Sequence, residues 1–200
     1  MEIVHRAVER YLMISTEGVV SARLDADSFL ITPTGCDRGS VEIEDLVLTQ
    51  EGRREAGKLP SRSVRLHNAI YRTHPGTHCI ITAQSPNATA YAISETRFDT
   101  RTIPESYVLL RDIPVIPYGT QFREPERVAA ALSPATPVLL IQNDAVMTTG
   151  STILKAFDRL EVAEFSAKAL LDTAMIGSHV PIGEEDIADL KRAFNLAEED

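Results

Sequence analysis

The sequence predicts an α/β fold, and three observations support this prediction. Short runs of β-favouring residues, such as 79–82 and 138–142, alternate with segments whose apolar residues recur every three or four positions. The longest of these segments, 153–176, predicts a helix long enough to cross a protein core. The chain has 200 residues, of which 44% are hydrophobic, as is usual for one globular unit. We therefore expect a single domain over residues 1–200.

The first half of the chain predicts helices and strands in alternation. The expected elements are a helix over 2–15, strands over 19–24, 29–32 and 46–49, a helix over 63–73, a strand over 79–82 and a helix over 86–93. The turn-rich segment 25–28 favours a hairpin between the first two strands. Ser85 followed by Pro86 is typical of an N-cap and a first-turn proline, so Ser85 is expected to cap the last helix.

In the second half, Pro and Gly residues punctuate 94–122, so irregular backbone with one strand is expected there. The expected elements after it are a helix over 126–132, strands over 138–142 and 145–149, a helix over 153–176 and a helix over 185–196. Asn143 and Asp144 suit a tight hairpin between the two strands. Ser151 or Thr152 is expected to cap the long helix and Gly177 to end it.

The charge balance argues against two classes of partner. Twenty Lys and Arg residues against 29 Asp and Glu give a net charge of −9 without a basic cluster, so neither nucleic acid nor an anionic membrane is expected to bind. No apolar run is long enough for a membrane span, and residues 1–6 alternate charged and apolar side chains unlike a signal peptide. A cytoplasmic location is therefore expected. Cys36 and Cys79 are too few for a disulfide framework and are expected to be free thiols.

Two turns indicate a site for a small anion. Thr34-Gly35 lies on one turn and Ser61-Arg62-Ser63 at the start of a helix, so that backbone N–H groups, hydroxyls and a guanidinium would converge on a phosphate or carboxylate. The alternative is that the serines only cap the helix. The five histidines have no metal-binding spacing, and His67, on the apolar face of its helix, is typical of a hydrogen-bonded core residue.

Three ordered motifs resemble the class II aldolase/adducin family, in particular L-fuculose-phosphate aldolase. They are the segments 29–35 (FLITPTG), 57–61 (GKLPS) and 66–72 (LHNAIYR), and the likeness continues through 138–140 and the helix with Glu161. The resemblance implies a three-layer α/β/α fold with a central, largely antiparallel sheet. It also implies a homotetramer with sites between subunits, a zinc ion held by three histidines, a catalytic glutamate and glycine-hydroxyl turns that hold a sugar phosphate.

The departures from the family pattern fall on the metal and acid/base positions. Thr82 and Gln84 stand where the family has a His-x-His pair, and Asp144 stands where it has the third histidine. Ser63 replaces the glutamate, and Val19 after Gly18 replaces an asparagine on the phosphate side. No zinc or other cofactor is therefore expected, although oxygen donors at these positions would hold Mg²⁺ or Mn²⁺ weakly.

These observations favour a non-catalytic homologue that binds a small phosphorylated or carboxylated compound or has a structural role. The expected ligand-binding residues, by the resemblance and the turn chemistry, are Gly18, Thr34, Gly35, Ser61 and Arg62.

Two alternatives remain open. One is an aldehyde-lyase, epimerase-like or other enzyme with altered chemistry, whose catalytic candidates are Tyr107, Asp144, Glu105 and His67. The other is an adducin-like protein-interaction module.

Overall fold

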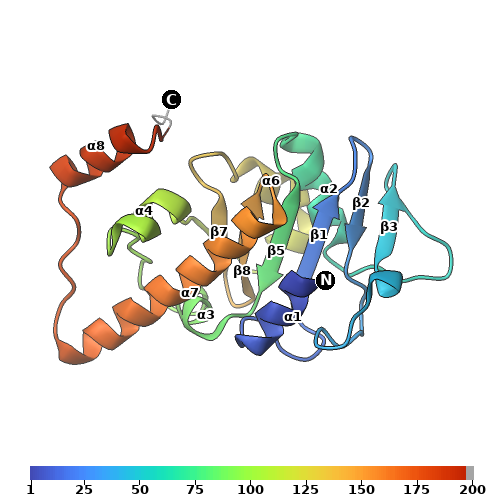
Figure 1. Cartoon of the computed structure of the whole chain (residues 1–200), viewed down its shortest axis with the longest axis horizontal. Coiled ribbons are helices and arrows are strands. Elements are labelled where there is room, and N and C mark those ends of the chain that lie inside the picture. Colours follow the sequence, from blue (N-terminus) through green and yellow to red (C-terminus); the bar gives the residue numbers. More distant parts are fainter. Residues whose placement is uncertain (197–200) are drawn as a thin grey trace.

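A mixed, mostly antiparallel sheet forms the centre of the molecule in the computed structural model, which describes residues 1–196 (Figure 1). The strands are β1 (Val19–Arg23), β2 (Ser28–Ile31), β3 (Val47–Gln50), β4 (Arg53–Arg54), β5 (Cys79–Ala83), β6 (Val115–Ile116), β7 (Val138–Ile141) and β8 (Ala145–Gly150). Their order in the sheet is β4-β3-β2-β1-β5-β8-β7-β6, and only the β6–β7 pair is parallel. The predicted α/β class with a largely antiparallel sheet is confirmed.

Helices cover both faces of this sheet. They are α1 (Glu2–Glu9), α2 (Val64–Thr73), α3 (Pro86–Ala92), α4 (Pro104–Leu110), α5 (Thr120–Arg123), α6 (Pro125–Ala130), α7 (Ile153–Ile176) and α8 (Glu184–Ala193), with the short 3₁₀ helix η1 (Ile43–Asp45). One apolar cluster joins α1, α3 and α7 to one face of the sheet, and a second joins α2 and α6 to the other. The expected three layers are therefore present.

Strand β5 shows why two apolar clusters form. All five of its residues are buried, and side chains on a strand point alternately to opposite faces. Ile81 and Ala83 belong to the cluster under α7, whereas Ile80 belongs to the cluster under α2. A strand covered on both faces has a nearly continuous apolar sequence, and in this segment Thr82 is the one polar residue.

The long helix α7 has the predicted bounds. Thr152 caps it, because its Oγ1 accepts a hydrogen bond from the backbone N–H of Lys155 at 3.1 Å, and Gly177 follows its last residue. The hairpin between β7 and β8 also matches the prediction, with Asn143 in the left-handed region (φ 54°). These features depend on local sequence, which explains why they were predictable.

The first helix is shorter than predicted, and the prediction of a helix over 2–15 was wrong beyond Glu9. Tyr11 has a positive φ of 58°, and the backbone N–H groups of Leu12 and Met13 both donate to the carbonyl of Ala7. This turn buries Leu12 and Met13 directly beneath the helix. Their apolar character reflects that burial and not a continued helical face.

The prediction of irregular backbone over 94–122 was wrong in part, because α4 lies within this segment and α5 begins there. Pro104 occupies the first turn of α4, where its missing N–H costs nothing, so this proline starts a helix. The helix lies on the same face as α7 and buries Leu110. The prediction that Ser85 caps the helix after it was also wrong for the side chain, which makes no cap hydrogen bond to α3.

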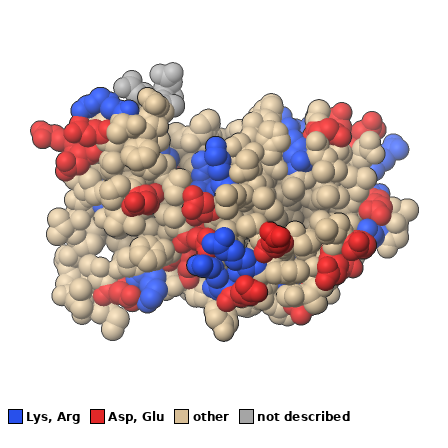
Figure 2. Space-filling view, in the orientation of Figure 1, with Lys and Arg blue, Asp and Glu red and all other residues tan. Residues whose placement is uncertain are grey.

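Charged residues on the face drawn in Figure 2 are mixed in sign. Lys and Arg side chains lie beside Asp and Glu and do not gather in one basic patch on this face. Arg6 and Arg10, for example, both pair with Glu161 on α7, at 2.8 and 3.0 Å. Within residues 1–196, no helix combines the length and apolar character needed to cross a membrane.

Candidate functional site

A cavity of about 310 Å³ lies at one edge of the sheet and contains most of the predicted site residues. At this edge β2 ends, β1 begins, β5 ends and β8 begins, because these neighbouring strands are antiparallel. The predicted residues that line the cavity are Gly18, Thr34, Gly35, Ser61, Arg62, Thr82, Gln84 and Asp144. The topology therefore brings together residues that are up to 126 positions apart in the sequence.

The side of the cavity that carries Thr34, Gly35, Ser61 and Arg62 is called the anion wall below. Its two loops pair with each other, since the N–H of Thr34 donates to the Leu59 carbonyl and the N–H of Ser61 to the Thr32 carbonyl, both at 3.1 Å. Gly35 has a φ of 68°, which favours glycine. This pairing holds the turn after β2 and the start of α2 side by side.

Ser61 takes part in the turn that precedes α2 as well as lining the cavity. Its Oγ accepts a hydrogen bond from the backbone N–H of Ser63 at 3.3 Å, whereas the Ser63 side chain makes no cap bond. The guanidinium of the exposed residue Arg62 stands over the Phe122 ring, 5.6 Å from its centroid. Arg62 makes no ion pair within the described chain, so its donors remain available to a ligand.

Arg38 is a cavity residue that the sequence analysis missed. It is only 2% exposed, and it donates to the carbonyls of Gly18, Cys36 and Pro33 at 2.7–2.9 Å. Burial lowers the pKa of its guanidinium, an effect opposed by the nearby Glu17 and other acidic groups. A lone arginine after a turn carries no local signal of this role, because its partners are brought to it by the fold.

A second side of the cavity carries Thr82, Gln84 and Asp144 and is called the acceptor wall below. Ala83 faces Val146 in the β5–β8 ladder, so the residues that follow β5 and precede β8 are neighbours. Oγ1 of Thr82 and Oε1 of Gln84 are shielded from solvent without a hydrogen-bond partner. Asp144 Oδ2 accepts from Gln121 Nε2 at 2.7 Å. Gln121 was also missed in the sequence.

His67 lies outside the cavity, in the core. It is fully buried on α2, its Nδ1 is 2.7 Å from Ser21 Oγ, and that hydroxyl is also 2.7 Å from the Tyr71 hydroxyl. Burial lowers the pKa of His67 to about 3, which keeps the imidazole neutral. The prediction of a hydrogen-bonded core histidine is confirmed.

The remaining catalytic candidates lie apart from the cavity within this chain. Glu105 and Tyr107 are on α4, which packs against α7 on the face of the sheet opposite α2. Cys36 and Cys79 are free thiols, as expected, and burial raises the pKa of Cys79 to about 12. Across residues 1–196, no three His, Cys, Asp or Glu side chains come together in a group able to hold a metal.

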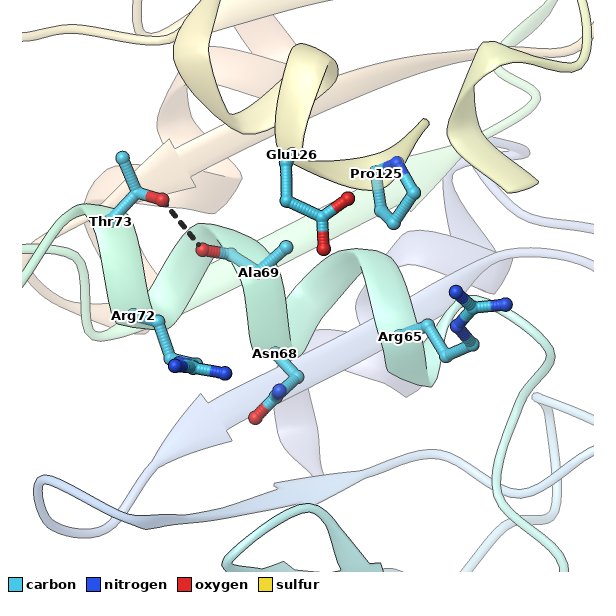
Figure 3. A pocket seen from close by; sticks show the side chains of 7 residues that line it. All are labelled: Arg65, Asn68, Ala69, Arg72, Thr73, Pro125 and Glu126. Carbon is cyan, nitrogen blue, oxygen red and sulfur yellow. Dashed lines mark hydrogen bonds between the residues drawn. The ribbon is translucent and has the colours of Figure 1, made fainter. Parts of the chain in front are cut away.

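A larger hollow of about 530 Å³ lies along the outer side of α2, beside the start of α6 (Figure 3). Arg65, Asn68 and Arg72 line it from α2, and Glu126 points toward α2 from α6. Arg65, Arg72 and Glu126 are solvent-exposed, and no shielded polar atom without a partner lines the hollow. We place the candidate site in the smaller cavity, where buried polar groups and two loops converge.

Relatives with three different activities are similar to this chain. The L-fuculose phosphate aldolase of Methanococcus vannielii is 29% identical over 84% of this chain and 91% of its own length. The 3-oxo-tetronate 4-phosphate decarboxylase of Haemophilus influenzae is 32% identical over 80% and 79%. The methylthioribulose-1-phosphate dehydratase of Acidiphilium cryptum is 28% identical over 76% and 78%.

Solved structures and a family model support the same relationship. An L-fuculose 1-phosphate aldolase structure superimposes with a TM-score of 0.84 and 23% identity over 97% of this chain and 93% of that chain, a likeness of fold. The family described as the class II aldolase and adducin N-terminal domain matches residues 1–171. The chain therefore belongs to the class II aldolase and adducin family.

Proposed function

We propose that this protein binds a small phosphorylated compound in the cavity at the sheet edge, without zinc. The observation that carries the proposal is the anion wall, where Thr34, Gly35, Ser61 and Arg62 lie together on two paired loops. Hydroxyls, backbone N–H groups and a guanidinium form charge-assisted hydrogen bonds with phosphate oxygens. The substrate names of the three relatives described above differ in the bond that reacts but share a phosphate group.

The acceptor wall does not fit the zinc ion of the family. Zinc sites in proteins use imidazole nitrogen, thiolate sulfur and carboxylate oxygen, whereas Thr82 and Gln84 offer a hydroxyl and an amide. Asp144 is the one good anionic ligand of the three, and one of its oxygens already accepts from Gln121. Ser63 at the position of the catalytic glutamate has no carboxylate to move a proton. We therefore derive no catalytic step through zinc and propose a non-catalytic binding role.

An enzyme with altered chemistry is the second candidate. The carboxylate of Asp144 lines the cavity, and its hydrogen bond from Gln121 would hold it in place as a general base. The activities named for the relatives favour this candidate, because they show that one family accommodates several reactions. Turnover of a phosphorylated hydroxy compound that is lost in Asp144→Asn would support it.

We also propose that the chain forms a homotetramer, as the family resemblance implies. Phe165, Met175 and Ile176 on α7 are 62%, 86% and 88% exposed, and exposed apolar side chains on one helix favour burial between copies.

The central experiment measures the affinity for inorganic phosphate by calorimetry. Arg62→Ala should weaken binding by about 1.5 to 3 kcal/mol, the usual range for a hydrogen bond to a charged group. Arg65→Ala is the matched control, because Arg65 is exposed on α2 outside the cavity. Equal affinity in the wild type and Arg62→Ala would contradict a role for Arg62 in anion binding.

A second experiment addresses zinc. After dialysis, elemental analysis should find no stoichiometric zinc, and a retro-aldol assay with fuculose phosphate in added zinc, manganese or magnesium should show no turnover. One tightly bound zinc per chain with turnover would contradict the proposed function.

A further inference from the structure

The acceptor wall consists of side chains that offer oxygen atoms, and they lie close together for a structural reason. Thr82 is on the same face of β5 as Ile80, the face covered by α2, because the two residues are two positions apart on a strand. Gln84 follows β5 and Asp144 precedes β8, its neighbour in the sheet. The three residues therefore line the same cavity, at the ends of neighbouring strands.

Two of the oxygens on this wall have no partner. Thr82 is 6% exposed, and its Oγ1 is shielded without a hydrogen bond, as is Oε1 of Gln84. A shielded polar oxygen without a partner lowers stability, because it has lost its hydrogen bonds to water and gained none in the protein. Both residues line the cavity, so a hydrogen-bond donor on a ligand bound against this wall would give these oxygens a partner.

The third side chain adds a negative charge. Asp144 takes part in none of the ion pairs among residues 1–196. Arg38 is a buried cation in the cavity lining, but it already donates to three backbone carbonyls. The cavity therefore presents a guanidinium at the anion wall, from Arg62, and a carboxylate without an ion pair at the acceptor wall.

We propose that the acceptor wall binds a primary ammonium group, so that the ligand of this cavity is a phosphorylated primary amine. An ammonium has three N–H donors, which match one oxygen each from Thr82, Gln84 and Asp144. A hydroxyl has one donor and would leave two of these oxygens unsatisfied. The inference rests on the proposed function, because the anion wall must hold the phosphate of the same ligand.

The spacing of the strands sets the length of the ligand. Gly18 and Thr34, on the anion side, flank β1 and β2, whereas the acceptor wall flanks β5 and β8. Neighbouring strands lie about 5 Å apart, so the two walls are separated by about 5 to 14 Å along the sheet edge. A chain of about four carbon atoms between phosphate and ammonium falls within this range.

The test compares three phosphate esters with the same four-carbon chain by calorimetry at pH 7.5, where a primary amine is protonated. The probes are 4-aminobutyl phosphate, 4-hydroxybutyl phosphate and n-butyl phosphate. The amine should bind at least about tenfold more tightly than either of the others, since one hydrogen bond to a charged group is worth that factor or more.

A variant localises the preference to the acceptor wall. Asp144→Asn keeps the shape of the side chain and removes its charge, so the preference for the amine over n-butyl phosphate should fall to less than about threefold. Asp158→Asn is the matched control, because Asp158 is exposed on α7 away from the cavity. It should keep the full preference.

Other outcomes overturn the inference in distinguishable ways. If all three esters bind equally, or if the hydroxyl ester binds most tightly, the ammonium inference is wrong and the proposed function stands. If n-butyl phosphate gains affinity on addition of Mg²⁺ and Asp144→Asn removes that gain, the wall binds a metal cation and the inference is wrong. If neither these esters nor inorganic phosphate binds, the proposed function itself fails.

Discussion

The guanidinium of Arg38 donates from Nε to the carbonyl oxygen of Gly18 over 2.8 Å, and this bond joins the start of β1 to the turn after β2. The same side chain donates to the carbonyls of Cys36 and Pro33, so one arginine ties both ends of the turn that carries Thr34 and Gly35 to the segment before β1. No other residue type offers donors in a fixed planar fork for three carbonyls at once.

Replacement of Arg38 by Met should therefore lower the free energy of unfolding by about 3 kcal/mol, because three buried carbonyls lose their partner. Arg38→Lys should recover only part of the loss. Urea unfolding followed by circular dichroism measures both values. The exposed Arg65 serves as the control, since Arg65→Met should change the stability by less than about 0.5 kcal/mol. A similar loss in both variants would contradict a bracing role for Arg38.

Gly18 and Gly35 both have a positive φ, 88° and 68°, but their surroundings differ. A Cβ on Gly18 would lie 2.7 Å from Cγ of the buried Met13, whereas a Cβ on Gly35 would meet nothing within 4 Å. Gly35→Ala should cost about 1 kcal/mol for backbone strain, and Gly18→Ala about 3 kcal/mol for strain and overpacking. Urea denaturation measures the two costs. Equal losses would show that Met13 moves aside without cost.

Glu164 on α7 caps α3 in place of Ser85. Its carboxylate accepts from the backbone N–H groups of Asn87 and Ala88 at 2.9–3.1 Å and from Asn87 Nδ2 at 2.7 Å. Glu164→Ala should lower the free energy of unfolding by about 1 to 2 kcal/mol, as expected for a lost cap.

The control for this variant is Asp158→Ala, an exposed carboxylate on the same helix, which should have little effect. Ser85→Ala should also have little effect, because its hydroxyl accepts no cap bond. A larger loss in Ser85→Ala than in Glu164→Ala would reverse the assignment.

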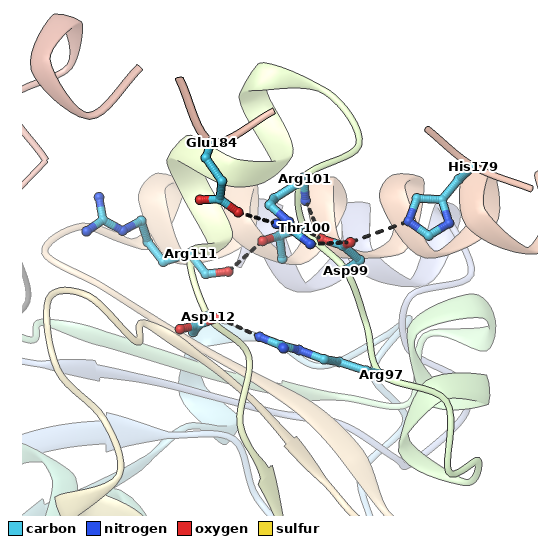
Figure 4. A network of polar contacts seen from close by, with 8 residues as sticks. All are labelled: Arg97, Asp99, Thr100, Arg101, Arg111, Asp112, His179 and Glu184. Atoms are coloured by element: carbon cyan, nitrogen blue, oxygen red, sulfur yellow. Dashed lines mark hydrogen bonds and ion pairs between the residues drawn. The ribbon is translucent and has the colours of Figure 1, made fainter. Parts of the chain in front are cut away.

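Asp99 contacts His179, in the segment between α7 and α8, and this contact is expected to be sensitive to acid (Figure 4). Burial acts to raise the pKa of this carboxyl, but hydrogen bonds from Arg101 and His179 outweigh it and lower the pKa to about 2. The folded-state pKa lies below the ordinary value of 3.8, so the stabilisation is present above about pH 4 and is lost as the pH falls through about 2.

Asp99→Asn should therefore lose less stability than the wild type between pH 4 and 2. The melting temperature across this range measures the difference. A matched control is Asp112→Asn, since Asp112 pairs with Arg97 at an exposed position and should follow the wild type. Parallel curves for Asp99→Asn and the wild type would contradict the depressed pKa.

The proposed homotetramer predicts a particle of about 88 kDa, four times the 22.0 kDa of one chain. Size-exclusion chromatography with light scattering measures this mass at micromolar concentration. Replacing Met175 and Ile176 by Asp on the exposed end of α7 tests whether that surface is buried between copies, and should shift the mass downward. A wild-type mass of 22 kDa would contradict the assembly.

The sequence by itself determined the α/β class, the hairpin at Asn143, the bounds of α7 and the family motifs on the loops of the anion wall. Periodicity, turn residues and caps act within a few positions of one another, so a linear pattern contains them.

Only the tertiary structure decided where the first helix ends, what caps α3 and which residues complete the cavity. Glu164 is 77 positions from Asn87, Gln121 is 23 from Asp144, and Arg38 is 20 from Gly18. Such contacts form because packing of the sheet and its two helical layers brings distant segments together, and no local propensity records that proximity.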